Sequence, residues 1–191
     1  MRNNRKALVL LLVVCLLIFL SVSRNIRKNE KQDEPEKKDY RRSEFRTEII
    51  VYNTRNKVIE KMDLDEYIVG VVAAEMPASF ELEALKAQAV AARTYTLYKR
   101  DHGGCSAHES ADICTNSNHC QAYVTDEEMT KNWGSKKAEY LAKITEAVTS
   151  TAGEAIYYQG ETIQVFYCAS AGGRTENSEN VYSQALPYLR S

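Results

Sequence analysis

The sequence predicts an α+β domain preceded by a membrane segment. Residues 62–100 carry two helical patterns that meet at Met76-Pro77, and short apolar runs on both sides of turn residues predict β-hairpins. Strands and helices do not alternate in βαβαβ order, and no phosphate-loop glycine pattern occurs. We therefore expect one mixed domain and not a doubly wound nucleotide-binding fold.

Composition limits the classes of partner. The chain has 191 residues, of which 44% are hydrophobic and 27% charged, which favours one domain able to bury a core. Its formal net charge of -1 gives no electrostatic reason to expect nucleic acid. A neutral glycan, a peptide or a small molecule is equally compatible.

The first 46 residues predict an anchor and a tether. A basic start, residues 1–6, precedes the apolar run Ala7 to Val22, which is short for a spanning helix and long for a signal-peptide core. We expect residues 1–22 to be a transmembrane anchor or uncleaved signal, favoured over a cleaved signal peptide, with the body outside the cytoplasm. Residues 23–46 are dense in charge and predict a flexible tether, so residues 47–191 form the domain.

The first helix of the pair ends in a carboxylate. Asp63 and Glu66 have the spacing of a capping box, so the helix is expected to start there. Its apolar stripe continues to Glu75, and Pro77 ends the helix just beyond. Burial would raise the pKa of this carboxyl group and suit it to hold a proton near neutral pH, although glutamates near helix ends are usually solvated or capping.

The second helix adds a basic face. Ser79 is a suitable N-cap, and Lys86 and Arg93, seven residues apart, share a face that differs from the packed one. Such a pair is more often a solvated surface than a binding site.

Shorter elements complete the fold. We expect a hairpin of residues 48–52 and 58–61, a loop at 102–125, helices at 126–134 and 136–149, and a second hairpin of 155–158 and 163–169. Gly172-Gly173 predicts a tight turn.

The loop holds a cluster of possible metal ligands. His108, Cys114, His119 and Cys120 can form a closed tetrahedral zinc set, with Cys105 as a spare, and such a set would be structural. The spacing matches no common zinc finger. Outside the cytoplasm, Cys105, Cys114, Cys120 and Cys168 can instead form two disulfides, or remain free thiols.

Two stretches resemble a known family. GVVAAEMPASFELEALKAQAVAARTYTL, residues 70–97, closely resembles the hallmark of the stage II sporulation protein D family, and FYCASAGGRTENSENV, residues 166–181, resembles its second hallmark. The loop ending HCQAY looks like the zinc-bearing loop of the clostridial branch, which uses two His and two Cys. The resemblance therefore favours structural zinc over disulfides.

The resemblance implies a function. It implies a membrane-anchored, extracytoplasmic lytic transglycosylase that cleaves peptidoglycan glycan strands, preferably stripped of stem peptides, during engulfment in endospore formation. Its implied partners are a sporulation amidase (stage II sporulation protein P) and a membrane scaffold (stage II sporulation protein M). The catalytic glutamate falls on Glu75. The implied substrate-side or supporting residues are Lys86, Arg93, Ser170, Gly172, Gly173, Thr175 and Tyr188.

Two other functions compete with this one. Related domains occur in amidase enhancers, so a non-catalytic wall-binding module that stimulates an amidase is the alternative, and a disulfide-stapled septal protein is a third. Members of the family continue past residue 191, so we expect part of the cleft wall to lie beyond this sequence.

Overall fold

The computed structural model describes residues 47–168 and 170–191, which belong to one compact unit spanning Arg42–Ser191. The expected anchor and tether lie outside the described residues. Within the described ranges, no helix is long and apolar enough to cross a membrane.

A small sheet opens the domain. Strands β1 (Glu48–Asn53) and β2 (Val58–Asp63) form the expected antiparallel hairpin. Strand β3 (Ile113–Cys114), from the middle of the expected loop, pairs parallel with β1 and gives the order β2-β1-β3. Alternation places Ile49 and Val51 of β1 in the core. The loop of Cys and His residues is therefore fixed to the sheet.

The helix pair follows the hairpin directly. Helix α2 (Leu64–Glu75) begins where expected, because the Asp63 carboxylate accepts hydrogen bonds from two amides of its first turn. Helix α3 (Leu82–Asp101) begins later than expected. Residues 77–80 form a turn in which the Phe80 amide bonds to the Pro77 carbonyl, so Ser79 is not the N-cap.

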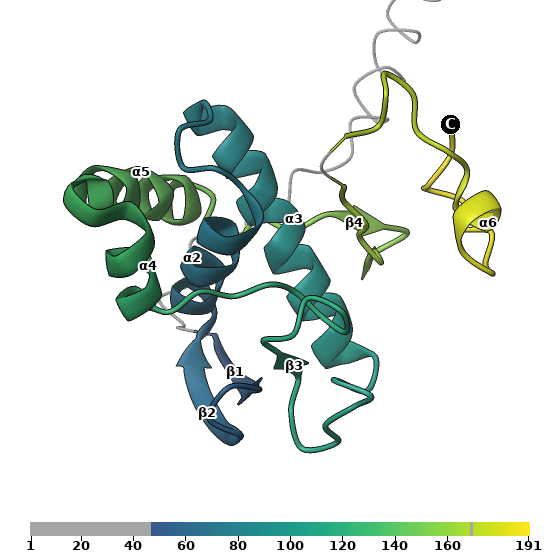
Figure 1. Cartoon of the computed structure of the whole chain (residues 1–191). Helices are drawn as coiled ribbons and strands as arrows, with labels where there is room; N and C mark the ends of the chain where they lie inside the picture. Colours follow the sequence, from purple (N-terminus) through teal and green to yellow (C-terminus); the bar gives the residue numbers. More distant parts are fainter. Residues whose placement is uncertain (1–46, 169) are drawn as a thin grey trace, which may run out of the picture. The chain divides into compact units, whose positions relative to one another are not determined.

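Three helices enclose the main core. Helix α5 (Lys137–Ser150), close to the expected 136–149, packs against both α2 and α3 (Figure 1). The buried apolar side chains come from all three helices and from the sheet. They include Ile49, Leu64, Tyr67, Ile68, Val71, Val72, Leu85, Ala89, Ala92, Ile113, Ile144 and Val148.

Short elements complete the described chain. Helix α4 (Asp126–Trp133) carries a full capping box between Thr125 and Glu128 and leads through the 3-10 turn Gly134–Lys136 into α5. The second hairpin is shorter than expected, since only β4 (Tyr157–Tyr158) and β5 (Glu161–Thr162) pair. The following residues Ile163 and Val165 are buried instead. Helix α6 (Ser178–Val181) lies near the C-terminus and was not expected.

Candidate functional site: an acid, a buried arginine and a Cys/His cluster

Glu75 is the last residue of α2 and is half-buried. The next residue, Met76, is extended with φ -135, the conformation favoured before a proline, so the helix stops at the carboxylate. Glu75 Oε1 accepts a hydrogen bond of 2.8 Å from the amide of Ala122. Glu75 therefore contacts a segment 47 residues away in sequence, which the sequence did not indicate.

Residues 120–124, which we call the strap, run from the Cys/His loop along the helix pair. The amide of Val124 donates to the carbonyl of Gly70 on α2. The ring of Tyr123 lies over Gly70, where an added Cβ would come within 2.2 Å of Tyr123 Cε2. Gly70 thus allows the strap to approach α2 and to present the Ala122 amide to Glu75.

Gln121 in the strap is buried and joins three groups. Its Oε1 accepts a hydrogen bond of 3.0 Å from Thr96 Oγ1. Its Nε2 donates to the Ala92 carbonyl and, at 2.9 Å, to the Tyr167 hydroxyl. A carbonyl oxygen can only accept, so the nitrogen of Gln121 must face Ala92 and Tyr167. Sequence reasoning named neither Gln121 nor Tyr167 as a site residue.

Tyr167 is electrostatically linked to Glu75. Burial of its hydroxyl and the nearby Glu75 charge raise the pKa of Tyr167 to about 12, against the opposing effect of the Gln121 hydrogen bond. Tyr167 is therefore a neutral hydroxyl at physiological pH.

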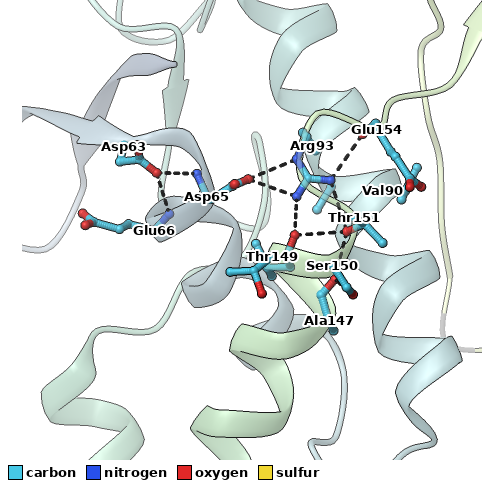
Figure 2. A network of polar contacts seen from close by, with 12 residues as sticks. Asp63, Asp65, Glu66, Val90, Arg93, Ala147, Thr149, Ser150, Thr151 and Glu154 are labelled. Carbon is cyan, nitrogen blue, oxygen red and sulfur yellow. Dashed lines mark hydrogen bonds and ion pairs between the residues drawn. The ribbon is translucent and has the colours of Figure 1, made fainter. Parts of the chain in front are cut away.

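Arg93 lies away from the acid, in the centre of a polar network. Its side chain is 1% exposed, and Nε and Nη2 both donate to Asp65 Oδ1, at 3.2 and 3.0 Å. Nη2 also donates to the Val148 carbonyl, and Nη1 donates to Thr151 Oγ1 and the Glu154 carbonyl. Figure 2 shows this network joining α3 to the start of α2 and the end of α5. All five N–H donors of the guanidinium are used within the protein.

Lys86 lies on the surface of α3. Its Nζ forms an ion pair of 2.7 Å with Glu83 of the same helix. The hydrogen bond that Lys86 donates to Glu83 is the main cause that raises the pKa of Lys86. The two basic residues expected to share a face are thus in different environments, since Arg93 is buried and Lys86 is half-buried at the surface.

A Cys/His cluster lies at the start of the strap. One ligand atom from each of Cys105, Cys114, His119 and Cys120 lies within 4.8 Å of all the others, so the group can hold a metal ion. His119 Nδ1 is 3.4, 3.6 and 3.3 Å from the sulfurs of Cys105, Cys114 and Cys120, and the Cys120 and Cys105 sulfurs are 3.8 Å apart. His119 Nε2 is 3.2 Å from Ser106 Oγ, so Nδ1 is the nitrogen that faces the sulfurs.

The cluster differs from the expected ligand set in one residue. Cys105, expected to be a spare, takes the place of His108. The His108 ring stacks on Tyr52 of β1, with ring centroids 3.7 Å apart. Cys105 is buried, and its amide donates to the Ala111 carbonyl, which folds the loop back and turns the thiol inward.

The four described cysteines are all free thiols. Burial raises the pKa of the Cys114 and Cys120 thiols above the ordinary value. A cation among them would favour the thiolates and oppose that cost.

The second motif forms the expected tight turn. Gly172 and Gly173 have φ of 59 and 89, a left-handed pair that suits glycine, and Ser170 and Thr175 beside them are exposed. Tyr188 is half-buried and accepts a hydrogen bond from the Gln164 amide.

Comparison with known proteins identifies the family. A family model described as stage II sporulation protein (SpoIID) matches residues 52–158, a range that contains Glu75 and all four cluster residues. Stage II sporulation protein D of Bacillus amyloliquefaciens is 39% identical over 141 residues, 74% of this chain and 41% of that protein. The protein of the same name from Bacillus subtilis is 39% identical over 143 residues, 75% of this chain and 42% of that protein.

A third relative, from Bacillus subtilis and named amidase enhancer, is 38% identical over 120 residues, 63% of this chain and 14% of that protein. The chain therefore spans about two fifths of the length of the sporulation relatives that it matches. Because the family model covers more than half of the sequence, this chain is a member of the stage II sporulation protein (SpoIID) family.

Proposed function

We propose that this protein is a peptidoglycan lytic transglycosylase in which Glu75 is the acid and base. The observation that carries the proposal is the position of Glu75. It is half-buried where α2 ends, and Ala122 holds one of its oxygens while Oε2 has no hydrogen bond among the described residues. Oε2 is therefore the atom suited to carry the proton. The family membership of the chain supports a role at the cell wall during sporulation.

One carboxyl group suffices for this reaction. Protonated Glu75 gives its proton to the leaving glycosidic oxygen as the bond from C1 to that oxygen breaks. The resulting carboxylate lies beside the positive charge that develops on the sugar ring. It then takes the proton from the 6-hydroxyl of the same sugar as that oxygen bonds to C1, which gives a 1,6-anhydro end. Since the nucleophile belongs to the substrate, no second carboxylate is needed to activate water.

The Cys/His cluster is proposed as a structural zinc site. Tetrahedral zinc places two sulfur ligands about 3.8 Å apart and a sulfur and a nitrogen about 3.6 Å apart. The separations in the cluster, 3.8 Å between two sulfurs and 3.3 to 3.6 Å from sulfur to nitrogen, are close to these values. Four protein ligands close the coordination sphere, so zinc here would hold the loop together.

The test is a product analysis of peptide-free glycan strands incubated with the protein and with Glu75→Ala. We expect the parent protein to release fragments with the anhydro mass in mass spectrometry and Glu75→Ala to release none while its circular dichroism stays unchanged. Anhydro products from a folded Glu75→Ala variant would refute the catalytic assignment.

A second candidate is a wall-binding module that stimulates an amidase, which the similarity to a protein named amidase enhancer favours. The same incubation separates the two, because a binding module retains glycan in a pull-down without shortening it and accelerates peptide release by a sporulation amidase. The amidase (stage II sporulation protein P), the scaffold (stage II sporulation protein M) and the location at the septal membrane remain part of the proposal.

A further inference from the structure

The three thiols of the Cys/His cluster differ in exposure and in backbone setting. Cys105 and Cys114 are fully buried, whereas Cys120 is half-buried. Cys114 lies in β3, where pairing with Tyr52 of β1 fixes its backbone. Cys105 and Cys120 lie outside helices and strands. Cys120 is therefore the thiol of the cluster that a small molecule in solution reaches first.

The sulfurs of Cys105 and Cys120 are 3.8 Å apart. Their backbones keep them near this distance, because the Cys105 amide donates to the Ala111 carbonyl and the Cys120 amide donates to the Asn116 carbonyl. A disulfide bond is about 2 Å long, so side-chain rotations that bring the sulfurs closer by about 1.8 Å allow the bond to form.

A disulfide and the proposed metal site exclude each other. Thiolates hold a metal through their negative charge, which the sulfurs of a disulfide have lost. Oxidation of Cys105 and Cys120 would leave Cys114 and His119, two of the four ligand groups. Since a cation binds only the reduced cluster, it also favours the reduced state over the oxidised one.

We propose that the Cys/His cluster is a redox switch in which a hydroperoxide joins Cys105 and Cys120 in a disulfide that displaces the metal and loosens the strap beside Glu75. The inference rests on the zinc site proposed above, but it does not require Glu75 to be catalytic. Outside the cytoplasm, where we propose that this domain lies, thiols are not kept reduced by glutathione, so the bound metal is what protects them.

The oxidation proceeds in two steps. The Cys120 sulfur attacks one oxygen of the hydroperoxide, the O–O bond breaks, and an alcohol or water leaves, which gives a sulfenic acid on Cys120. The Cys105 sulfur then attacks the Cys120 sulfur, the S–O bond breaks, and the oxygen leaves as water. Two electrons pass from the two sulfurs to the hydroperoxide.

The strap connects this reaction with the acid. Cys120 is its first residue, and the Ala122 amide, two residues further on, donates the 2.8 Å hydrogen bond to Glu75. Loss of the metal and movement of the Cys120 sulfur toward Cys105 remove the anchor at this end of the strap. We therefore expect the Ala122 amide to open more often in the oxidised protein.

The experiment uses the full chain in detergent with Cys168→Ser, which removes an exposed thiol outside the cluster. Reduced protein is prepared with zinc and after removal of zinc by a chelator, and both forms are treated with hydrogen peroxide. We expect the metal-free form to lose two thiols per chain, and the zinc form to lose them on the order of tenfold more slowly. In the zinc form, a coloured chelator should report one zinc released for every two thiols lost.

Peptide mapping after alkylation should place the disulfide between Cys105 and Cys120 and the alkyl group on Cys114. Cys114→Ser is the matched control, because it removes a cluster thiol that the disulfide does not use, and its metal-free form should give the same disulfide. Hydrogen exchange at the Ala122 amide should be faster in the oxidised protein than in the zinc form. Dithiothreitol with added zinc should restore the slow exchange.

A disulfide that leaves Cys105 or Cys120 free, or equal oxidation rates with and without zinc, would overturn the proposal. Unchanged exchange at the Ala122 amide after oxidation would overturn the control of the strap. A reduced chain that takes up no zinc in elemental analysis would refute the metal site itself, whereas zinc uptake without protection from peroxide would refute only this inference. No glycan is present, so the result is independent of the cleavage test.

Discussion

At the scale of single residues, Glu75 depends on groups that come from elsewhere in the chain. Ala122 bonds one of its oxygens, and the Glu75 charge in turn helps to keep Tyr167 protonated. The carboxylate and the hydroxyl are held by neighbouring residues of the strap, so their relative position is set by one short segment.

We predict that Glu75→Gln lowers the pKa of Tyr167 from about 12 toward the ordinary value of tyrosine, because it removes the nearby negative charge. The signal of Tyr167 Cζ in a tyrosine-labelled sample, assigned by its loss in Tyr167→Phe, reports the titration. Because the pKa of Tyr167 is higher in the folded than in the unfolded state, its contribution to stability is fully present below about pH 10. This contribution is lost as the pH rises through about 12. An unchanged pKa in Glu75→Gln would mean that the two side chains are too far apart to interact.

Arg93 carries a structural role in this fold. Its five hydrogen bonds reach α2, α5 and the residues after α5, and none of its donors is left for a sugar. Arg93, which the resemblance implied as a substrate-side or supporting residue, can therefore act by supporting the helix that ends in Glu75.

We predict that Arg93→Met lowers the free energy of unfolding by about 2–3 kcal/mol. This loss of unfolding free energy is smaller than that expected for a fully buried ion pair, because the side chain of the partner, Asp65, is 35% exposed. Lys86→Met is the control and should leave the urea midpoint unchanged, since its ion pair with Glu83 is exposed. Loss of glycan binding in Arg93→Met at unchanged stability would instead assign Arg93 to the substrate.

At the scale of elements, the strap connects the Cys/His cluster with the acid. Cys120 belongs to the cluster, Gln121 holds Tyr167, Ala122 bonds Glu75, and Tyr123 covers Gly70. We therefore expect that a structural change in the Cys/His cluster alters the position of the groups around Glu75, and the reverse, because the five residues of the strap join them.

We predict that Gly70→Ala destabilises the protein by about 1–3 kcal/mol, because its Cβ would overlap the Tyr123 ring. Displacement of the strap should also lower glycan cleavage more than the loss of folded protein explains. In a Tyr123→Leu background the same change should be neutral or stabilising by up to about 1 kcal/mol, since alanine favours helix more than glycine. Additive effects in this double-mutant cycle would show that the strap does not press on Gly70.

The ligand set of the cluster gives a second prediction at this scale. Cys105→Ser should reduce the zinc bound per chain, measured by elemental analysis, whereas His108→Ala should leave it unchanged, because His108 stacks on Tyr52 outside the cluster. Removing zinc with a chelator should speed hydrogen exchange at the Ala122 amide, since Cys120 anchors the strap. Zinc loss in His108→Ala with full zinc in Cys105→Ser would restore His108 as the ligand.

At the scale of the whole molecule, the described domain is proposed to act outside the cytoplasm on the cell wall, tethered by its N-terminus. We predict that deleting residues 1–22 moves the protein from the membrane fraction to the soluble fraction, because the deletion removes the apolar run. Sedimentation after a high-salt wash measures this. Continued sedimentation of the shortened chain would place the membrane attachment elsewhere.

The sequence by itself determined the local features. Asp63 starts α2 because its side chain caps the first turn, Pro77 stops the helix at Glu75, and the hairpins lie around their turn residues. These outcomes depend on neighbours a few residues apart, so the pattern sufficed. The motif of α2 and α3 likewise predicted the family that the comparison identified.

Only the tertiary structure decided which distant residues meet. The pattern placed Arg93 on a basic surface, but packing buries it because Asp65 and the end of α5 satisfy its charge and donors. The sequence predicted His108 as a ligand and Cys105 as a spare, whereas the fold of the loop against β1 brings Cys105 into the cluster in place of His108. The strap reached Glu75 across 47 residues, a contact made by the packing of helices and loop that no local pattern encodes.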